Sequence, residues 1–196
     1  MPLKVTPLPI PLEQAPSEAE APPPQLEFAA PVANSNPLPV PQVFQRTEKW
    51  CWAACLQMVL NYLGQGAQQC DVVDKAFGQS ICCGAPDDPE CNNSLGMWDI
   101  ATAYTSCQLS ASLVTSAVQW SYLDFEIKAG RPVQVGFDWT GGGGHVAMVC
   151  GTGMAGTVPF VVVNDPKFGR GSVYYANLLS AYNLGGSWQW TWVSIA

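Results

Sequence analysis

The sequence predicts an α+β fold: one compact domain, residues 43–196, follows a Pro-rich N-terminal arm, residues 1–42. The arm holds 12 of the 17 prolines and none of the 18 glycines, so the two parts differ in backbone character. Within the domain, helical spacing of apolar residues comes first, and short β-rich runs separated by glycines come second. This segregated order is typical of α+β domains, and we expect a cleft between the two halves.

The arm is predicted to be disordered and extended. It contains a single aromatic residue, Phe28, and its prolines favour polyproline II backbone without internal hydrogen bonds. The other 20 aromatic residues lie in the 154 residues of the domain, which is enough chain for one hydrophobic core. We therefore predict one folded domain.

Three helices are predicted in the first part of the domain. The first covers Trp50–Leu63, where apolar residues recur at three- and four-residue spacings before Gly64 ends the pattern. A second pattern covers residues 97–104. A third covers residues 120–129, and Gly130 is its natural C-cap.

Five strands are predicted in the second part of the domain. Each is a short run rich in β-branched and aromatic residues, bounded by glycine-bearing turns. They are residues 132–139, 145–151, 160–165, 172–175 and 188–195.

The charge of the chain limits its partners. The formal net charge is −7, and no cluster of Lys and Arg is present in the sequence. Such a surface is poorly suited to neutralising phosphates, so we expect neither nucleic acid nor an anionic membrane as a partner. No stretch approaches the roughly 20 apolar residues that span a bilayer. Residues 1–20 also lack the apolar core of a conventional signal peptide.

Eight cysteines are many for a chain of this size in a reducing compartment. Four of them, Cys70, Cys82, Cys83 and Cys91, lie in a polar stretch that we predict to be a long loop. Disulfides are favoured over a metal site, because the stretch has no Cys-x-x-Cys pair and no nearby His. In either case the role of these cysteines is structural.

Cys51 is the candidate nucleophile. It lies at the predicted start of the first helix, where unpaired backbone N–H groups and the macrodipole favour a thiolate. The alternative is a buried or bridged cysteine, since seven others compete for the role. Cys55, one turn further along, is expected to stay protonated and inert. Gln45 lies six residues before Cys51, and its amide could join the Cys51 N–H in holding a developing oxyanion.

His145 and Asp165 are the candidate partners of Cys51. A Cys nucleophile usually needs a His as general base, and His145 is the single histidine of the chain. It begins a predicted strand directly after four glycines; the alternative is a histidine that only packs in the core. Asp165, which ends the run FVVVND, is the candidate that orients the imidazole. Asn164 competes with it, and Asn-Asp-Pro is also a common turn.

Taken together, these residues resemble the papain-like cysteine peptidases. The resemblance is carried by Gln45, the run Cys51–Ala53, the pair Gly144–His145 and the run Asn164–Pro166, in this chain order. Within that fold the sequence is most similar to a compact bacterial branch, the avirulence effector proteases of plant-pathogenic bacteria, whose helix opens with a Trp-Cys-Trp-Ala-Ala-type motif. The resemblance implies an N-terminal helical half with a central helix, a C-terminal antiparallel β-sheet or half-barrel, and an active-site cleft between them.

The resemblance also implies an activity. It makes the protein a cysteine endopeptidase with Cys51 as nucleophile, His145 as general base and acid, Asp165 as orienter and Gln45 as oxyanion donor. It implies a protein or peptide substrate, a monomer, and neither metal nor cofactor. A secreted bacterial effector or toxin protease follows from the same branch, delivered into a host or competitor cell by a dedicated secretion system. Two alternatives stay open: an acyltransferase or deamidase with the same triad, and a non-catalytic, disulfide-stapled binding module.

The resemblance does not fix the walls of the cleft. Trp98, Trp120 and Trp139 are candidates for them, and ordinary core packing is the alternative for each. The cysteine-rich stretch is not required by the chemistry, so substrate choice stays open.

Overall fold

A computed structural model describes residue 35, residues 37–183 and residues 185–196. Most of the predicted arm, residues 1–42, lies outside the described residues, and the division of the chain at residue 42 stays a prediction. The described end of the arm is in contact with the domain.

In the described part of the chain, five helices form. Their bounds are α1 (Cys51–Tyr62), α2 (Gln69–Phe77), α3 (Met97–Ser106), α4 (Trp120–Lys128) and α5 (Tyr175–Ser180). The three predicted helices are present as α1, α3 and α4. Helix α5 was not predicted, because six residues are too few to show a helical period. None of these helices has the length and apolar character that crossing a bilayer requires.

Helix α2 corrects the prediction of a long loop that begins at Cys70. It starts where the Gln68 N–H donates to Asp71 Oδ2 at 3.3 Å, a contact of the capping-box kind. It ends at Gly78, whose φ of 65° is the left-handed conformation common at helix C-termini. The loop prediction was wrong over residues 70–77, because the polar residues and cysteines there obscure a short amphipathic period.

The described strands form one six-stranded antiparallel sheet in the order β1-β6-β2-β3-β4-β5. Their bounds are β1 (Ser112–Val114), β2 (Val133–Trp139), β3 (Gly144–Ala155), β4 (Val158–Asp165), β5 (Gly169–Tyr174) and β6 (Gly186–Val193). All five predicted strands are present, and β3 is longer than predicted. The three-residue β1 was not predicted, because it is too short to show alternation. The predicted α+β class is confirmed.

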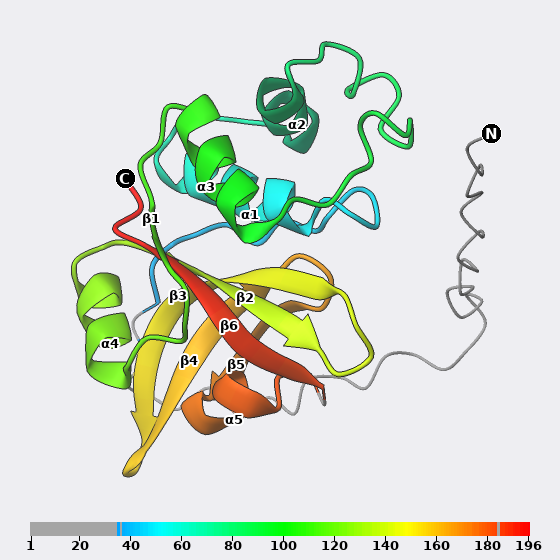
Figure 1. The fold of residues 1–196 in the computed structure, drawn as a ribbon. Helices are drawn as coiled ribbons and strands as arrows, with labels where there is room; N and C mark the ends of the chain where they lie inside the picture. The colour runs from blue at the N-terminus through cyan, green and yellow to red at the C-terminus, as the bar shows by residue number, and fades with distance from the viewer. Residues whose placement is uncertain (1–34, 36, 184) are drawn as a thin grey trace, which may run out of the picture.

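Helices cover both faces of the sheet, as Figure 1 shows. Helices α1, α2 and α3 lie on one side of the sheet, where α1 packs against β3 and α2 packs on α1 and α3. Val146 and Met148 of β3 belong to the apolar cluster on this side. Helices α4 and α5 cover the other face, where Ala147 and Val149 of the same strand are buried. Because alternate residues of a strand point to opposite faces, β3 contributes to both apolar clusters.

Two disulfides fix the segment between α2 and α3. They join Cys70 to Cys83 and Cys82 to Cys91, which confirms the predicted staples. We call residues 79–96 the stapled loop. Cross-links in a segment with so little regular structure reduce the conformations open to its unfolded chain.

Two tryptophans attach the stapled loop to the start of α1. The indole N–H of Trp50 donates to Cys91 O at 2.9 Å, and that of Trp52 donates to Asn93 O at 3.0 Å. Both indoles are buried. The loop is therefore held against the first turn of α1.

Residues 38–42, which we call the strap, run along the sheet before α1 begins. The Leu38 N–H donates to Cys150 O at 2.7 Å, and Asn164 Nδ2 donates to Val40 O at 2.9 Å. The Val40 side chain is buried in the cluster that also contains α1. The strap thus joins the sheet and the helical layer.

Candidate active site

Cys51 is the first residue of α1. Trp50 before it provides no side-chain cap, and the first turn holds no acidic residue. The unpaired N–H groups and the positive end of the macrodipole are therefore not neutralised by the helix's own side chains. The Cys51 thiol is free and half-buried. A helix start of this kind favours a thiolate, and an oxyanion formed beside it.

His145 and Asp165 come together from neighbouring strands. His145 is the second residue of β3, and Asp165 is the last residue of β4. The imidazole Nε2 lies 3.0 Å from both carboxylate oxygens of Asp165. Cys51 and His145 line the same two hollows, and Cys51 is close enough to contribute to the raised pKa of the imidazole. Because Nε2 faces the carboxylate, Nδ1 is the ring nitrogen left for Cys51.

His145 and Asp165 each stabilise the ionised form of the other. Burial works against a charged imidazole, yet Asp165 and the neighbouring Cys51 raise the pKa of His145 to about 10. Burial also works against an ionised Asp165, but His145 and the other donors hold the pKa of that carboxyl below its ordinary value. The pair is therefore imidazolium and carboxylate at neutral pH.

Three donors besides His145 hold the Asp165 carboxylate. The backbone N–H groups of Lys167 and Phe168 donate to Oδ1 at 2.7 and 2.9 Å. The Tyr182 hydroxyl donates to Oδ2 at 2.6 Å. The first two come from the turn after β4, so the Asn-Asp-Pro turn and the contact with His145 exist together.

Asn164, the competing candidate, points away from His145. Its Nδ2 donates to Val40 O, and its Oδ1 accepts from the Cys150 thiol at 3.5 Å. Neighbouring residues of a strand face opposite sides of the sheet, which separates Asn164 from Asp165. Of the two, Asp165 is the residue that reaches the imidazole.

Gln45 lies at the site, but its donors point elsewhere. It lines a hollow together with Cys51 and His145. Its Nε2 donates to Thr47 O at 2.9 Å and to Glu48 O at 2.8 Å. An amide nitrogen carries two N–H groups, so both are used by the turn before α1. Donation to an oxyanion requires one of these contacts to be released.

Cys55 lies one turn into α1 and has no exposed surface. Its thiol contacts Val146 O at 3.8 Å. Burial, together with the charges of Cys51 and Asp165, raises the pKa of the Cys55 thiol well above its usual range. The thiol therefore stays protonated, which is the state predicted for it.

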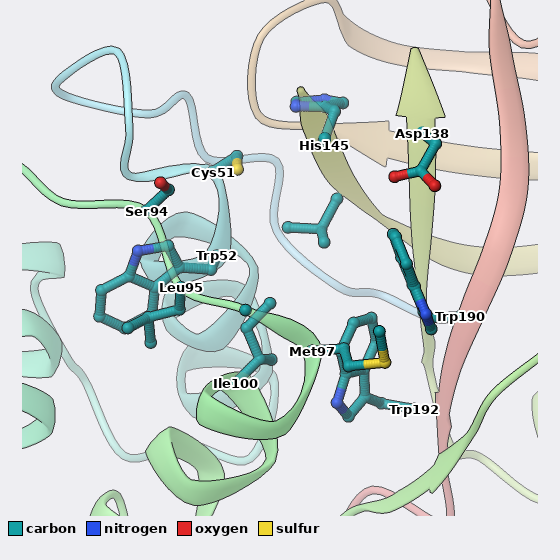
Figure 2. Close-up of a pocket in the computed structure, with 13 residues that line it drawn as sticks. Cys51, Trp52, Ser94, Leu95, Met97, Ile100, Asp138, His145, Trp190 and Trp192 are labelled. Atoms are coloured by element: carbon teal, nitrogen blue, oxygen red, sulfur yellow. The ribbon is translucent and has the colours of Figure 1, made fainter. Parts of the chain in front are cut away.

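Two hollows share Cys51, Gly144 and His145 in their walls. The first, which we call the apolar pocket, has a volume of about 280 Å³. Figure 2 shows Trp190 and Trp192 on one side of it and Trp52 and Leu95 on the other. Its further walls include Met97, Ile100, Val146 and, as a polar group, Asp138.

The second hollow, which we call the polar hollow, has a volume of about 350 Å³. Beyond the three shared residues it is lined by Gln45, Glu48, Trp139, Lys167, Phe168 and Asn183. The two hollows therefore offer different surroundings to groups bound next to Cys51: one apolar, one charged.

The sequence reasoning missed Trp190 and Trp192. Both lie on β6 near Gly136 of β2, where an added Cβ would meet each indole at 3.1 Å. A register shift beside Gly136 lets Trp188 pack on the other face of the sheet while Trp190 and Trp192 line the pocket. No pattern revealed the shift, but an isolated glycine in a strand is a signal of close approach.

Of the three tryptophans named as cleft candidates, Trp139 lines one of the two hollows at the site, whereas Trp120 and Trp98 line neither. Trp139 lines the polar hollow and stacks on His145, with ring centroids 5.9 Å apart. Trp120 instead packs against Tyr175 on the opposite face. Trp98 is 66% exposed and belongs to neither hollow.

Comparison with known families gives one match. The model of the family described as papain-like cysteine protease AvrRpt2 matches residues 34–181. The match includes every residue named as catalytic by the sequence reasoning. No curated protein matches the chain.

Comparison with solved structures gives the fold. The peptidase domain of Streptococcus ComA, a bi-functional ABC transporter involved in a quorum-sensing pathway, aligns with a TM-score of 0.56 at 12% identity, over 80% of this chain and 98% of that chain. A putative C39-like peptidase from Bacillus anthracis aligns with a TM-score of 0.52 at 13% identity, over 79% and 94%. A double-glycine-motif protease from an AMS/PCAT transporter, solved with its leader peptide, aligns with a TM-score of 0.50 at 17% identity, over 81% and 94%. The predicted papain-like fold is confirmed.

Proposed function

Because the chain belongs to the papain-like cysteine protease AvrRpt2 family, we propose that it hydrolyses peptide bonds through a triad of Cys51, His145 and Asp165. Family membership confirms the predicted cysteine protease and implies a protein substrate, which favours an enzyme over a binding module. One arrangement carries the triad: His145 lies 3.0 Å from both oxygens of Asp165 and lines the same two hollows as Cys51.

The first half of the reaction forms an acyl-enzyme. The Cys51 thiolate attacks the carbonyl carbon of the scissile peptide, and the carbonyl oxygen becomes an oxyanion. When the oxyanion collapses, the bond between carbon and nitrogen breaks, and His145 gives its proton to the leaving amine. Asp165 keeps the imidazole in place throughout.

The oxyanion lies next to the start of α1. The Cys51 N–H and the helix macrodipole stabilise the negative charge there. Gln45 is proposed as the second donor, and it takes this role by exchanging its contact with Thr47 O or Glu48 O for the oxyanion. The apolar pocket then receives an apolar side chain of the substrate near the scissile bond.

The second half of the reaction restores the enzyme. Water enters, His145 takes its proton, and the resulting hydroxide attacks the thioester carbonyl. Loss of the Cys51 thiolate releases the acid product, which returns the thiolate and the imidazolium. No group other than these side chains and water is needed to balance the reaction.

We further propose that the protein acts as a monomer outside the reducing cytosol of its producer, as a secreted effector. Two disulfides support an oxidising compartment at some stage of its life. One chain supplies all three triad residues, which supports the monomer. The acidic composition supports a protein partner over nucleic acid or an anionic membrane.

The test is turnover of a peptide library, read by mass spectrometry. We expect Cys51→Ala and His145→Ala to abolish cleavage in folded protein, and Cys55→Ala to retain it. Hydrolysis adds one water across the cleaved bond, whereas acyl transfer adds an amine and deamidation converts Gln to Glu. Full hydrolysis by His145→Ala would contradict the triad, since the chain contains no second histidine.

Alkylation gives an independent check that needs no substrate. Iodoacetamide should label Cys51 rapidly, because a helix start and a neighbouring imidazolium are surroundings that make a cysteine reactive. Slow labelling that rises tenfold per pH unit would identify an ordinary thiol and contradict the proposed nucleophile.

A further inference from the structure

Tyr182 lies two residues after α5 and is fully buried beside the proposed triad. Its ring stacks on Phe137, with centroids 4.2 Å apart and planes 4° apart. Phe137 is the β2 residue paired with His145 in the sheet register. The ring of Tyr182 is therefore fixed by the same strands that carry the imidazole.

The hydroxyl of Tyr182 holds one oxygen of Asp165. Oδ1 already receives two backbone N–H groups, whereas Oδ2 receives the Tyr182 hydroxyl at 2.6 Å and shares the imidazole Nε2 with Oδ1. The terminal torsion of an Asp side chain is soft, so a carboxylate held at one oxygen can still rotate. Since Nε2 lies 3.0 Å from both oxygens, such a rotation would tilt the imidazole away from Cys51.

The Tyr182 hydroxyl remains a donor over the working pH range. Burial and the adjacent Asp165 raise the pKa of Tyr182 well above its ordinary value. The other titratable groups facing Asp165 are His145 from β3 and Cys55 from α1, with Cys51 beyond the imidazole. Tyr182 and Cys55 are neutral, so removing the hydroxyl changes the hydrogen bonding of Asp165 and leaves the charges as they were.

We propose that Tyr182 is a positioning residue of the reaction: by holding Asp165 Oδ2 it keeps the carboxylate in one rotation and the imidazole directed at Cys51. This inference rests on the proposed peptidase function. Tyr182 lines neither hollow, so its influence passes through Asp165 and not through contact with substrate.

The direct test is Tyr182→Phe, which keeps the ring stack and removes the hydroxyl. We expect kcat on a cleaved peptide to fall about tenfold, the worth of a hydrogen bond to a charged group, while KM stays within about twofold. Loss of the donor also raises the pKa of Asp165, so the acidic limb of the kcat–pH profile should move to higher pH. A purely structural residue would not move this limb.

Tyr175→Phe is the matched control. The Tyr175 hydroxyl donates to Val118 O at 2.7 Å, away from the triad. Its removal should leave kcat and the acidic limb unchanged. All kcat values are taken per Cys51 labelled by iodoacetamide, so that a lower folded fraction does not imitate a slower enzyme.

A double-mutant cycle separates positioning from folding. If Tyr182 acts through Asp165, adding Tyr182→Phe to Asp165→Asn should change kcat by less than about twofold. A full tenfold loss in that background, or an unchanged kcat and acidic limb in Tyr182→Phe alone, would overturn the positioning role. A wild-type chain that cleaves no peptide would instead overturn the proposed function, and the positioning role with it.

Discussion

A single imidazole carries the acid–base chemistry proposed for this protein, and its charge depends on two neighbours. Burial disfavours the imidazolium, but Asp165 and Cys51 more than compensate, and the pKa of His145 rises from 6.5 to about 10. Below that pH the ring is protonated in the folded protein. Since the proposed first step needs a proton for the leaving amine, the raised pKa extends the active range to alkaline pH.

We expect the alkaline limb of the kcat/KM–pH profile to lie near pH 10, where His145 loses its proton. The measurement is hydrolysis of a short peptide across the pH range. As a control, Asp165→Asn removes the charge that holds the proton, so its alkaline limb should lie at lower pH. A wild-type limb near 6.5, the ordinary value, would show that Asp165 does not stabilise the imidazolium.

Three of the residues that lie together at the site were predicted from the sequence, and the structure places each of them where its prediction expected it within a helix or strand. Cys51 was identified by its place at a helix start, His145 by being the only histidine, and Asp165 by ending a strand. The direction of the Gln45 donors and the contact of Tyr182 were not predictable. Both depend on side-chain rotamers and on loops whose path is set by distant packing.

Among the elements, β2 and β6 shape the apolar pocket through one glycine. A Cβ at Gly136 would lie 3.1 Å from both Trp190 and Trp192. The indoles can lie side by side over this position because no side chain occupies it. The packing of the pocket wall therefore depends on a residue that does not itself face the substrate.

We expect Gly136→Ala to destabilise the fold by about 1–3 kcal/mol, because the added methyl overpacks the indoles. It should also raise KM, since Trp190 and Trp192 must shift. Urea denaturation and peptide kinetics measure the two effects. Gly141→Ala is the control: a Cβ there meets nothing within 4 Å, so stability should stay within about 0.5 kcal/mol. Equal stability of both variants would contradict the close approach.

The stapled loop supplies the other wall of the apolar pocket. Its last residues, Ser94 to Gly96, line the pocket, and Trp52 holds the preceding residue Asn93. The Cys82–Cys91 bridge closes just before this segment, whereas the Cys70–Cys83 bridge attaches the far end of the loop to α2. The two bridges should therefore differ in their effect on substrate binding.

We expect the double variant Cys82→Ser with Cys91→Ser to raise KM several-fold with little change in kcat, because the pocket wall loosens while the triad stays in place. The matched control, Cys70→Ser with Cys83→Ser, should lower stability, by about 2–4 kcal/mol in the usual range, and change KM less. Peptide kinetics measure KM and kcat for both variants, and thermal melting measures their stability. An identical KM in the two double variants would show that the Cys82–Cys91 bridge has no special effect on the pocket wall.

The elements themselves were predicted with uneven success. The long helices and the five main strands have clear periods, so their existence followed from the sequence. Helix α2 was not predicted because its polar residues and cysteine resemble a loop, and α5 and β1 are too short to show a period. The shift of register beside Gly136 has one local signal, the isolated glycine, but its place and direction depend on how two strands fit together.

In the whole molecule, the site lies where the helical layer meets the sheet. Cys51 comes from the first layer, and His145 and Asp165 come from the second. The strap contacts both: Val40 is buried with α1, and Gln42 Nε2 donates to the backbone O of Asp165 at 2.8 Å. The sequence placed these residues in the arm, because prolines dominate their composition and tertiary contacts do not show in it.

Truncation tests the strap. We expect deletion of residues 1–36, which the sequence predicts to be disordered, to leave stability unchanged. Deletion of residues 1–42 should cost at least about 2 kcal/mol, because it exposes the site of the Val40 side chain and leaves Asn164 Nδ2 without its acceptor. Thermal melting of the two truncated chains gives the comparison. Equal melting temperatures would show that the strap contributes nothing.

The proposed triad is divided between two consecutive parts of the chain. Residues 115–119, between β1 and α4, divide the chain into one part with the nucleophile and another with the base and its orienter. No disulfide in the described residues joins these parts; β1 pairs with β6, and Ser110 exchanges backbone hydrogen bonds with Ala196 across the division. If the chain is cut within residues 115–119, neither fragment alone contains all three residues of the proposed triad. The fold is thus a natural scaffold for a split reporter, in which peptide cleavage registers the meeting of two proteins fused to its halves.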